Sequence, residues 1–113
     1  MANVPILSGT QVILDSEEVA QRTREELHPG VTYAVLWREH GSVAGLMWVE
    51  AGAAVPEHRH ERAAHHVWLV NGRALVDGRM LEQGSYWHVP PDTPHSVQGL
   101  APYGCTLFYL YLV

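Results

Sequence analysis

Three features are scarce in this 113-residue sequence: cysteine, lysine and long apolar runs. The single cysteine, Cys105, excludes an intrachain disulfide, so we expect a reducing compartment, namely the cytoplasm. Because no run of about 18 apolar residues is present, we expect no membrane-spanning helix and no membrane partner. Residues Met1–Gly9 contain no basic region followed by a long apolar run, so we also expect no signal peptide.

Positive charge is scarce as well. Seven arginines, with no lysine, stand against 12 acidic residues, and the net charge is −5 with the histidines neutral. Nucleic-acid-binding domains carry a basic patch or stripe, so this balance argues against a nucleic-acid partner. The exclusive use of arginine fits a GC-rich bacterial genome. An apolar content of 47% is typical of a globular chain, and the length suits one domain over residues 1–113.

Only one segment predicts a helix. Asp15–Glu18 has the pattern of a capping box, in which a short acceptor side chain is followed three residues later by Glu. Helix-forming residues continue to Leu27, and His28–Gly30 ends the pattern with Pro and Gly. We therefore expect one short N-terminal helix over about residues 16–28, with a short strand before it at Gln11–Leu14.

The rest of the chain predicts short strands separated by turns rich in Gly, Pro and Asn. The predicted strands are Val31–Arg38, Val43–Glu50, part of Arg59–Val70, Arg73–Val76, Arg79–Glu82, Ser85–Val89 and Cys105–Leu112. Asn71-Gly72 and Asp77-Gly78 are strong signals for tight turns between them. Many short strands with a single helix predict an all-β sandwich or barrel, with its core over about residues 31–112.

Two of the eight histidines, His58 and His60, are two residues apart. On a strand this spacing puts both side chains on one face, roughly 6 to 7 Å apart, where they can chelate one ion. His95 follows the Pro90–Pro94 turn, whose prolines restrict the backbone that carries it. These three histidines are therefore candidate metal ligands.

Strand parity assigns the next two histidines to opposite faces. His65 shares its parity with Val67 and Leu69, and His66 shares its parity with Trp68. If the two aliphatic residues point inward, His65 points inward and His66 and Trp68 point outward. His65 is thus a further candidate ligand.

Two segments resemble the conserved motifs of the cupin family. Gly52-x5-His58-x-His60-x4-His65-x6-Gly72 resembles the first motif, Gly-x5-His-x-His-x3-4-Glu-x6-Gly, and Gly84-x5-Pro90-x-Asp92-x2-His95 resembles the second, Gly-x5-Pro-x-Gly-x2-His. The resemblance implies a small single-domain cupin: an all-β antiparallel barrel, or jelly-roll sandwich, with one short N-terminal helix.

The chain departs from these motifs at two important positions. His65 stands where the family has a metal-binding Glu, as in its four-histidine variants, so the implied ligands are His58, His60, His65 and His95. A site of three histidines without His65, or with His66 in its place, stays open. Asp92 replaces a glycine, and Asp tolerates left-handed backbone better than most residues.

Four neutral imidazoles would leave a divalent ion its full charge, which makes it a stronger Lewis acid. Imidazole suits Zn, Fe, Cu and Ni, and related cupins also take Mn. The ion could be tetrahedral and structural, or octahedral with two open positions for water or substrate. Cupins commonly have the second form, which we prefer.

Seven aromatic residues and one methionine are candidates for a substrate pocket. They are Tyr33, Trp37, Met47, Trp48, Trp87, Phe108, Tyr109 and Tyr111. We expect Glu57 and Glu61 to face solvent, and His28, His40 and His88 to be surface or capping residues. An outward Trp68 would fit a homodimer interface, which cupins usually have.

The resemblance supports functions of different classes. The first is a metal-dependent enzyme in which the ion polarises a carbonyl-bearing or aromatic, polyketide-like small molecule, as in a cyclase, isomerase or lyase. This function is similar to that of the four-histidine cupins that are aromatic polyketide cyclases. An Fe(II) dioxygenase is the alternative enzyme. The region from Val31 onward also looks like the cupin domain of zinc-dependent anti-sigma factors, which implies a non-catalytic sensor. A structural or storage cupin is a further option.

Overall fold

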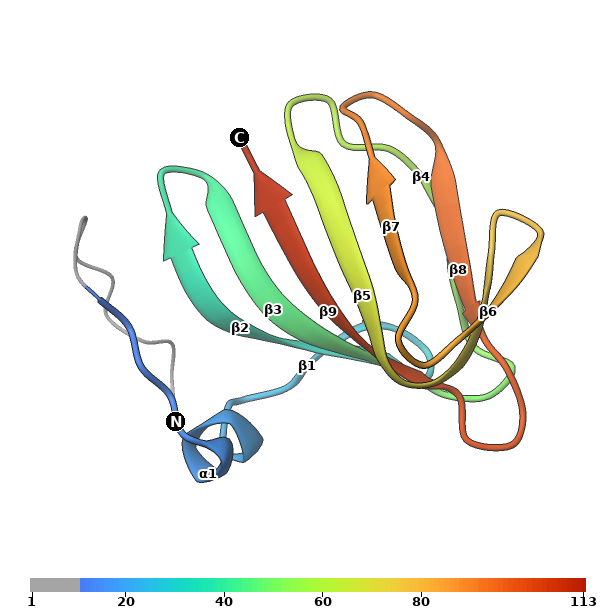
Figure 1. The fold of residues 1–113 in the computed structure, drawn as a ribbon, viewed down its shortest axis with the longest axis horizontal. Coiled ribbons are helices and arrows are strands. Elements are labelled where there is room, and N and C mark those ends of the chain that lie inside the picture. The colour runs from blue at the N-terminus through green and yellow to red at the C-terminus, as the bar shows by residue number, and fades with distance from the viewer. Residues whose placement is uncertain (1–10) are drawn as a thin grey trace.

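The computed structural model describes residues 11–113, which form one helix and nine strands (Figure 1). The elements are α1 (Ser16–Ala20), β1 (Glu25–His28), β2 (Val31–Glu39), β3 (Ser42–Val49), β4 (Ala54–His58), β5 (Ala64–Val76), β6 (Arg79–Glu82), β7 (Tyr86–Val89), β8 (His95–Gly99) and β9 (Cys105–Leu112). All pairings between these strands are antiparallel. The predicted all-β antiparallel barrel with one short helix is confirmed.

The long strand β5 joins the two sides of the barrel. The strand order is β1-β2-β3-β9-β5-β8-β4, and β6 and β7 also pair with β5. The first part of β5 pairs with β9 and β7, and its last part pairs with β6 and β8. Figure 1 shows β2, β3, β9 and β5 as one curved face, with β4 and β8 on the other side. One strand therefore belongs to both sheets.

The turn predicted at Asn71-Gly72 is wrong, because β5 bends there and continues. The register with β9 shifts between Leu69 and Asn71, and Gly72 has a φ of +83°. A Cβ at Gly72 would overlap the carbonyl oxygen of Gly104. Asn-Gly favours left-handed backbone in a bulge as well as in a tight turn, so the dipeptide alone did not separate the two.

The turn predicted at Asp77-Gly78 is confirmed. Both residues have positive φ, +47° and +82°, and they close the hairpin between β5 and β6, with Val76 paired to Arg79. Two consecutive positive φ values are the signature of the hairpin turn whose twist matches the flanking strands.

The helix is shorter than predicted. The capping box is present, since the Glu18 N–H donates to Asp15 Oδ1 at 2.8 Å and the Asp15 N–H donates to Glu18 Oε1 at 3.2 Å. However, α1 ends at Ala20, and Glu25–His28 forms an edge strand on β2. The predicted extension to about residue 28 is wrong because pairing with β2 outweighs the helix propensity of these residues. Gln11–Leu14, a predicted strand, has no regular secondary structure.

The predicted strand parity of β5 is confirmed. Val67 and Leu69 are 2% and 1% exposed in the core, whereas Trp68 between them is 39% exposed on the outer face. His65 follows the inward parity and is 8% exposed. In the part of the chain that the structure describes, no helix is long and apolar enough to cross a membrane.

Candidate metal centre

The four candidate histidines come from three strand ends and one connection. His58 ends β4, His95 begins β8 directly opposite it, and His65 is the second residue of β5. His60 lies in the connection between β4 and β5, so the two histidines do not share a strand and the strand spacing does not describe them. The two rings still lie close, with centroids 5.0 Å apart. The structure thus brings all four histidines to one end of the barrel.

Three of these histidines form a compact group. One ring nitrogen from each of His58, His60 and His95 lies within 4.8 Å of the others. His65 adjoins the group through His95, since its Nδ1 lies 3.4 Å from His95 Nε2. This contact is within hydrogen-bonding distance, and His65 lies outside the set of three whose ring nitrogens are all within 4.8 Å of one another. His58, His60 and His95 are therefore the core of the candidate site, with His65 beside it.

Backbone carbonyls orient two of the rings. The Nδ1 of His58 lies 2.7 Å from the carbonyl oxygen of Pro56, and the Nδ1 of His95 lies 2.9 Å from that of Thr93. A neutral imidazole donating through Nδ1–H to these oxygens keeps the lone pair of its Nε2 free. Metal-bound histidines usually have such a second hydrogen bond, which sets the tautomer and the ring orientation.

The other two rings carry buried nitrogens without a hydrogen bond. Neither His60 Nε2 nor His65 Nε2 has a hydrogen-bond partner among residues 11–113. A buried polar atom without a partner is costly, and in a native fold it commonly marks a group that binds something else. These nitrogens, together with the two oriented rings, fit a divalent ion.

The surroundings lower the pKa values of three of the rings, those of His60, His65 and His95, and so favour their uncharged form. Burial, together with the smaller effects of the neighbouring His95, His60 and His58, lowers the pKa of His65 to about 3. Burial is also the main cause of the lowered pKa values of His60 and His95. Only a neutral imidazole can bind a metal, so at neutral pH these three rings require no proton release before they bind an ion.

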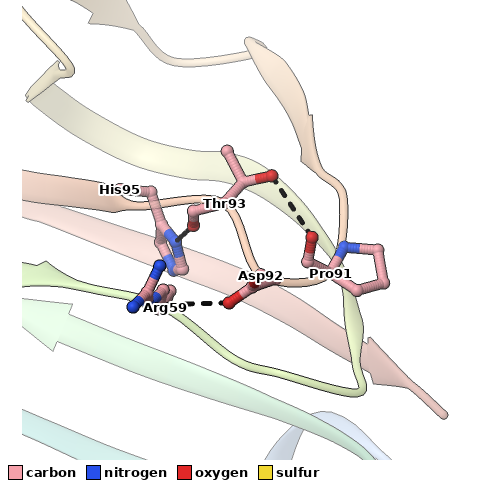
Figure 2. A network of polar contacts seen from close by, with 5 residues as sticks. All are labelled: Arg59, Pro91, Asp92, Thr93 and His95. Atoms are coloured by element: carbon pink, nitrogen blue, oxygen red, sulfur yellow. Dashed lines mark hydrogen bonds and ion pairs between the residues drawn. The ribbon is translucent and has the colours of Figure 1, made fainter.

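The connection that carries His60 contacts the turn that precedes His95. Figure 2 shows contacts from the Pro91–Thr93 turn to both Arg59 and His95, and the Arg59 guanidinium lies 3.5 Å from Asp92. The Asp92 N–H donates to the carbonyl oxygen of His60 at 2.6 Å. Asp92 has a φ of +59°, so the expectation that it adopts left-handed backbone in place of glycine is confirmed. These contacts hold His60 and His95 on adjacent loops.

The histidines open into a cavity of about 250 Å³. Apolar and aromatic side chains from both sides of the barrel make up most of its wall: Met47, Val55, Val67, Trp87, Val97, Leu107, Tyr109 and Tyr111. The ring of Tyr111 lies over those of His65 and His60, with centroid distances of 4.2 and 4.6 Å. The site is therefore a small apolar cup with imidazoles on one wall.

The structure places half of the predicted pocket residues in this wall. Met47, Trp87, Tyr109 and Tyr111 line the cavity, whereas Tyr33, Trp37, Trp48 and Phe108 do not. Neighbours on a strand point to opposite faces, so Met47 and Trp48 could not both line the cavity, nor could Phe108 and Tyr109.

The four other residues have different surroundings. Trp48 packs under the Arg24 guanidinium at 3.5 Å, and Phe108 lies 5.7 Å from Trp68 on the outer face. Tyr33 packs against the core, and Trp37 lines a separate groove.

Two residues of the cavity wall were expected at the surface. Glu57 is exposed and borders the cavity, and His28 is half-buried and lines it, a position that the sequence did not predict. The helix predicted over about residues 16–28 is the reason, because a helix gives no register that would place His28 beside the barrel strands. A strand assignment for Glu25–His28 would have placed His28 at the edge of the sheet.

Comparison with known proteins agrees with this architecture. A family model described as a ChrR cupin-like domain matches residues 12–112. The chain is 25% identical to an RmlC-like cupin from Shewanella frigidimarina, with a TM-score of 0.74 and 90% of each chain covered. No curated protein sequence matches this chain.

Two more distant structures share the fold. One is the complex of Rhodobacter sphaeroides SigE with the anti-sigma ChrR, at 21% identity, a TM-score of 0.70, and coverage of 79% of this chain and 48% of that one. The other is the polyketide cyclase RemF from Streptomyces resistomycificus, at 16% identity, a TM-score of 0.70, and coverage of 88% and 79%. The chain therefore belongs to the ChrR cupin-like domain family, within the cupin superfamily.

Proposed function

We propose that this protein is a metal-dependent cupin enzyme that acts on a small carbonyl-bearing or aromatic, polyketide-like molecule. The observation that carries the proposal is the pair of buried nitrogens, His60 Nε2 and His65 Nε2, which lack partners among the described residues and border an apolar cavity. Apolar cavities with a few convergent polar groups are the usual form of small-molecule sites.

The proposed ligands are His58, His60, His65 and His95. They would hold one divalent ion, with Zn, Fe, Ni, Mn and Cu all compatible with imidazole-rich sites. When bound, the ion supplies Lewis acidity that polarises a substrate oxygen, undiminished by any carboxylate ligand. A cyclase, an isomerase and a lyase all use this chemistry.

The cavity wall restricts what can bind. Met47, Val67 and Leu107 present apolar surface that excludes water from a bound molecule. At about 250 Å³ the cavity is slightly smaller than the roughly 300 Å³ at the low end of ligand pockets, so it suits a small substrate such as a single aromatic ring.

The tyrosines of the wall are neutral phenols. Burial raises the pKa of Tyr111 to about 12, and burial also raises the pKa of Tyr109 above its usual range. Both phenols therefore stay protonated near neutral pH, where they can donate to a substrate oxygen but cannot serve as bases.

Metal analysis of anaerobically purified protein tests the ligand set. We expect about one divalent ion per chain, with partial loss of affinity in His65→Ala and severe loss in His58→Ala. Unchanged affinity in His65→Ala would remove His65 from the ligands. Oxygen uptake during turnover of a panel of aromatic ketones would indicate an Fe(II) dioxygenase, and turnover without oxygen uptake supports the carbonyl chemistry.

A sensor is the second candidate, because the matching family model is described by ChrR and the fold is similar to the SigE–ChrR complex. In this case metal occupancy would control binding to a partner protein. A sensor would turn over no member of the substrate panel, whether loaded with zinc or with iron. Turnover that disappears on chelation and returns with metal would contradict the sensor.

A further inference from the structure

The edge strand β1 places two consecutive residues in the cavity wall. Leu27 and His28 both line the cavity. In a regular strand neighbouring side chains point to opposite faces, so only one of them could do so. The register between β1 and β2 shifts between Glu26 and His28, which marks a bulge. Bulges at sheet edges redirect a side chain, and this one allows both Leu27 and His28 to face the cavity.

The backbone after His28 is firmly anchored. Pro29 and Gly30 form the turn to β2, and Gly30 has a φ of +78°. A Cβ at Gly30 would lie 2.7 Å from the Cβ of Ala53, and the Gly30 carbonyl oxygen accepts a hydrogen bond from the Glu50 N–H at 2.9 Å. His28 is therefore held in place by a turn packed against the barrel, not carried on a free segment.

His28 and its neighbours form the mouth of the cavity. Leu27 is 44% exposed and Glu57 is exposed, while both border the same space as the buried histidines. Among the described residues that line the cavity, His28 is the one imidazole outside the candidate metal ligands. It can donate or accept a hydrogen bond at the end of the cavity that opens to solvent.

We propose that His28 hydrogen-bonds the outer end of the bound molecule, so that the site selects aromatic compounds with two polar ends. One end carries the oxygen directed at the histidine cluster, and the other carries an uncharged hydrogen-bonding group such as a phenol hydroxyl. The carboxylate of Glu57 at the same mouth disfavours an anionic outer group. This inference rests on the proposed function and names the substrate class of that site.

The test compares two hydroxamates that differ only at the outer end. Protein loaded with Co²⁺ is titrated with benzohydroxamate and with 4-hydroxybenzohydroxamate, and the visible spectrum of the cobalt gives each Kd. We expect the wild type to bind the 4-hydroxy compound about two- to ten-fold more tightly, as one added hydrogen bond provides. In His28→Leu the ratio should fall to about one, and His28→Gln should keep part of the preference.

The control variant is His88→Leu, which replaces an exposed histidine of β7 outside this cavity wall and should keep the wild-type ratio. An equal ratio in the wild type and His28→Leu would overturn the role of His28 and leave the proposed function standing. Acetohydroxamate, which has no ring, reports on the ion alone. If it leaves the cobalt spectrum of the wild type unchanged, the ion has no open position, and both the proposed function and the role of His28 are overturned.

Discussion

Acidification of the metal-free protein tests the buried state of His65. Burial and the neighbouring histidines lower the pKa of His65 to about 3 in the folded protein, against the ordinary value of 6.5. Between these two values the unfolded chain binds a proton that the folded chain does not. The stability contributed by neutral His65 is therefore present above about pH 6.5 and is lost as the pH falls toward about 3.

The expected loss follows from the size of this shift. One proton bound only by the unfolded state changes the free energy of unfolding by about 1.4 kcal/mol per pH unit. From about pH 7 to about pH 4, His65 should therefore remove about 3 kcal/mol of stability. This is a large fraction of the roughly 5–15 kcal/mol that stabilises a typical domain.

Urea unfolding of the metal-free protein at several pH values, followed by tryptophan fluorescence, measures this loss. His65→Leu should be less sensitive to acid than the wild type by about 3 kcal/mol over the same range, because it has no proton to bind at this position. His88→Leu, at an exposed position, should match the wild type. Identical acid sensitivity in the wild type and His65→Leu would refute the argument that His65 is buried and neutral.

Three further predictions concern other parts of the molecule. Gly72→Ala combines a φ of +83° with a clash against the Gly104 carbonyl oxygen. Gly78 has a similar φ but open space around it, so urea unfolding should show a loss of stability for Gly72→Ala well above the roughly 1 kcal/mol expected for Gly78→Ala. Equal losses of stability in the two variants would contradict the clash. Zinc at 100 times its Kd should raise the free energy of unfolding of metal-free protein by about 2.7 kcal/mol, EDTA should reverse this, and an unchanged Tm would contradict a native metal site. We also propose that the outward aromatic face around Trp68 pairs with a second copy of the chain. Light scattering should give the mass of a dimer for the wild type and for Met80→Glu, a control at another exposed position, but the mass of a monomer for Trp68→Glu. A monomeric wild type would contradict the proposal.

Strand parity and motif spacing predicted much of the barrel and the position of its histidines. The alternation of Val67, Trp68 and Leu69 requires one face to be buried, so it also predicted the inward position of His65. The spacing from Pro90 to His95 predicted a turn with a left-handed residue, which the structure has at Asp92. Local patterns were sufficient here because each depends on the geometry of one strand or one turn.

The errors have a common physical origin, since they concern contacts between distant segments. Glu25–His28 has helix-forming composition, and only the presence of β2 beside it makes it a strand. Because this segment was predicted to be a helix, the place of His28 in the cavity wall was missed as well. The choice between Trp48 and Met47 for the cavity wall likewise depended on which face of β3 the barrel encloses. Sequence patterns alone did not determine these tertiary relations.

The spread of the histidines over both sheets has a consequence for a chain that cannot form an intrachain disulfide. His65 belongs to the part of β5 that pairs with β9 and β7, whereas His95 and His58 belong to the pair β4–β8. An ion bound by His65 and His95, which are 30 residues apart, would be a cross-link between the two sheets. In the unfolded chain a closed loop of this length costs about 3–4 kcal/mol of conformational entropy, the same order as a disulfide provides. A bound ion would thus cross-link the two sheets of this small barrel, as a disulfide could if the chain had more than one cysteine.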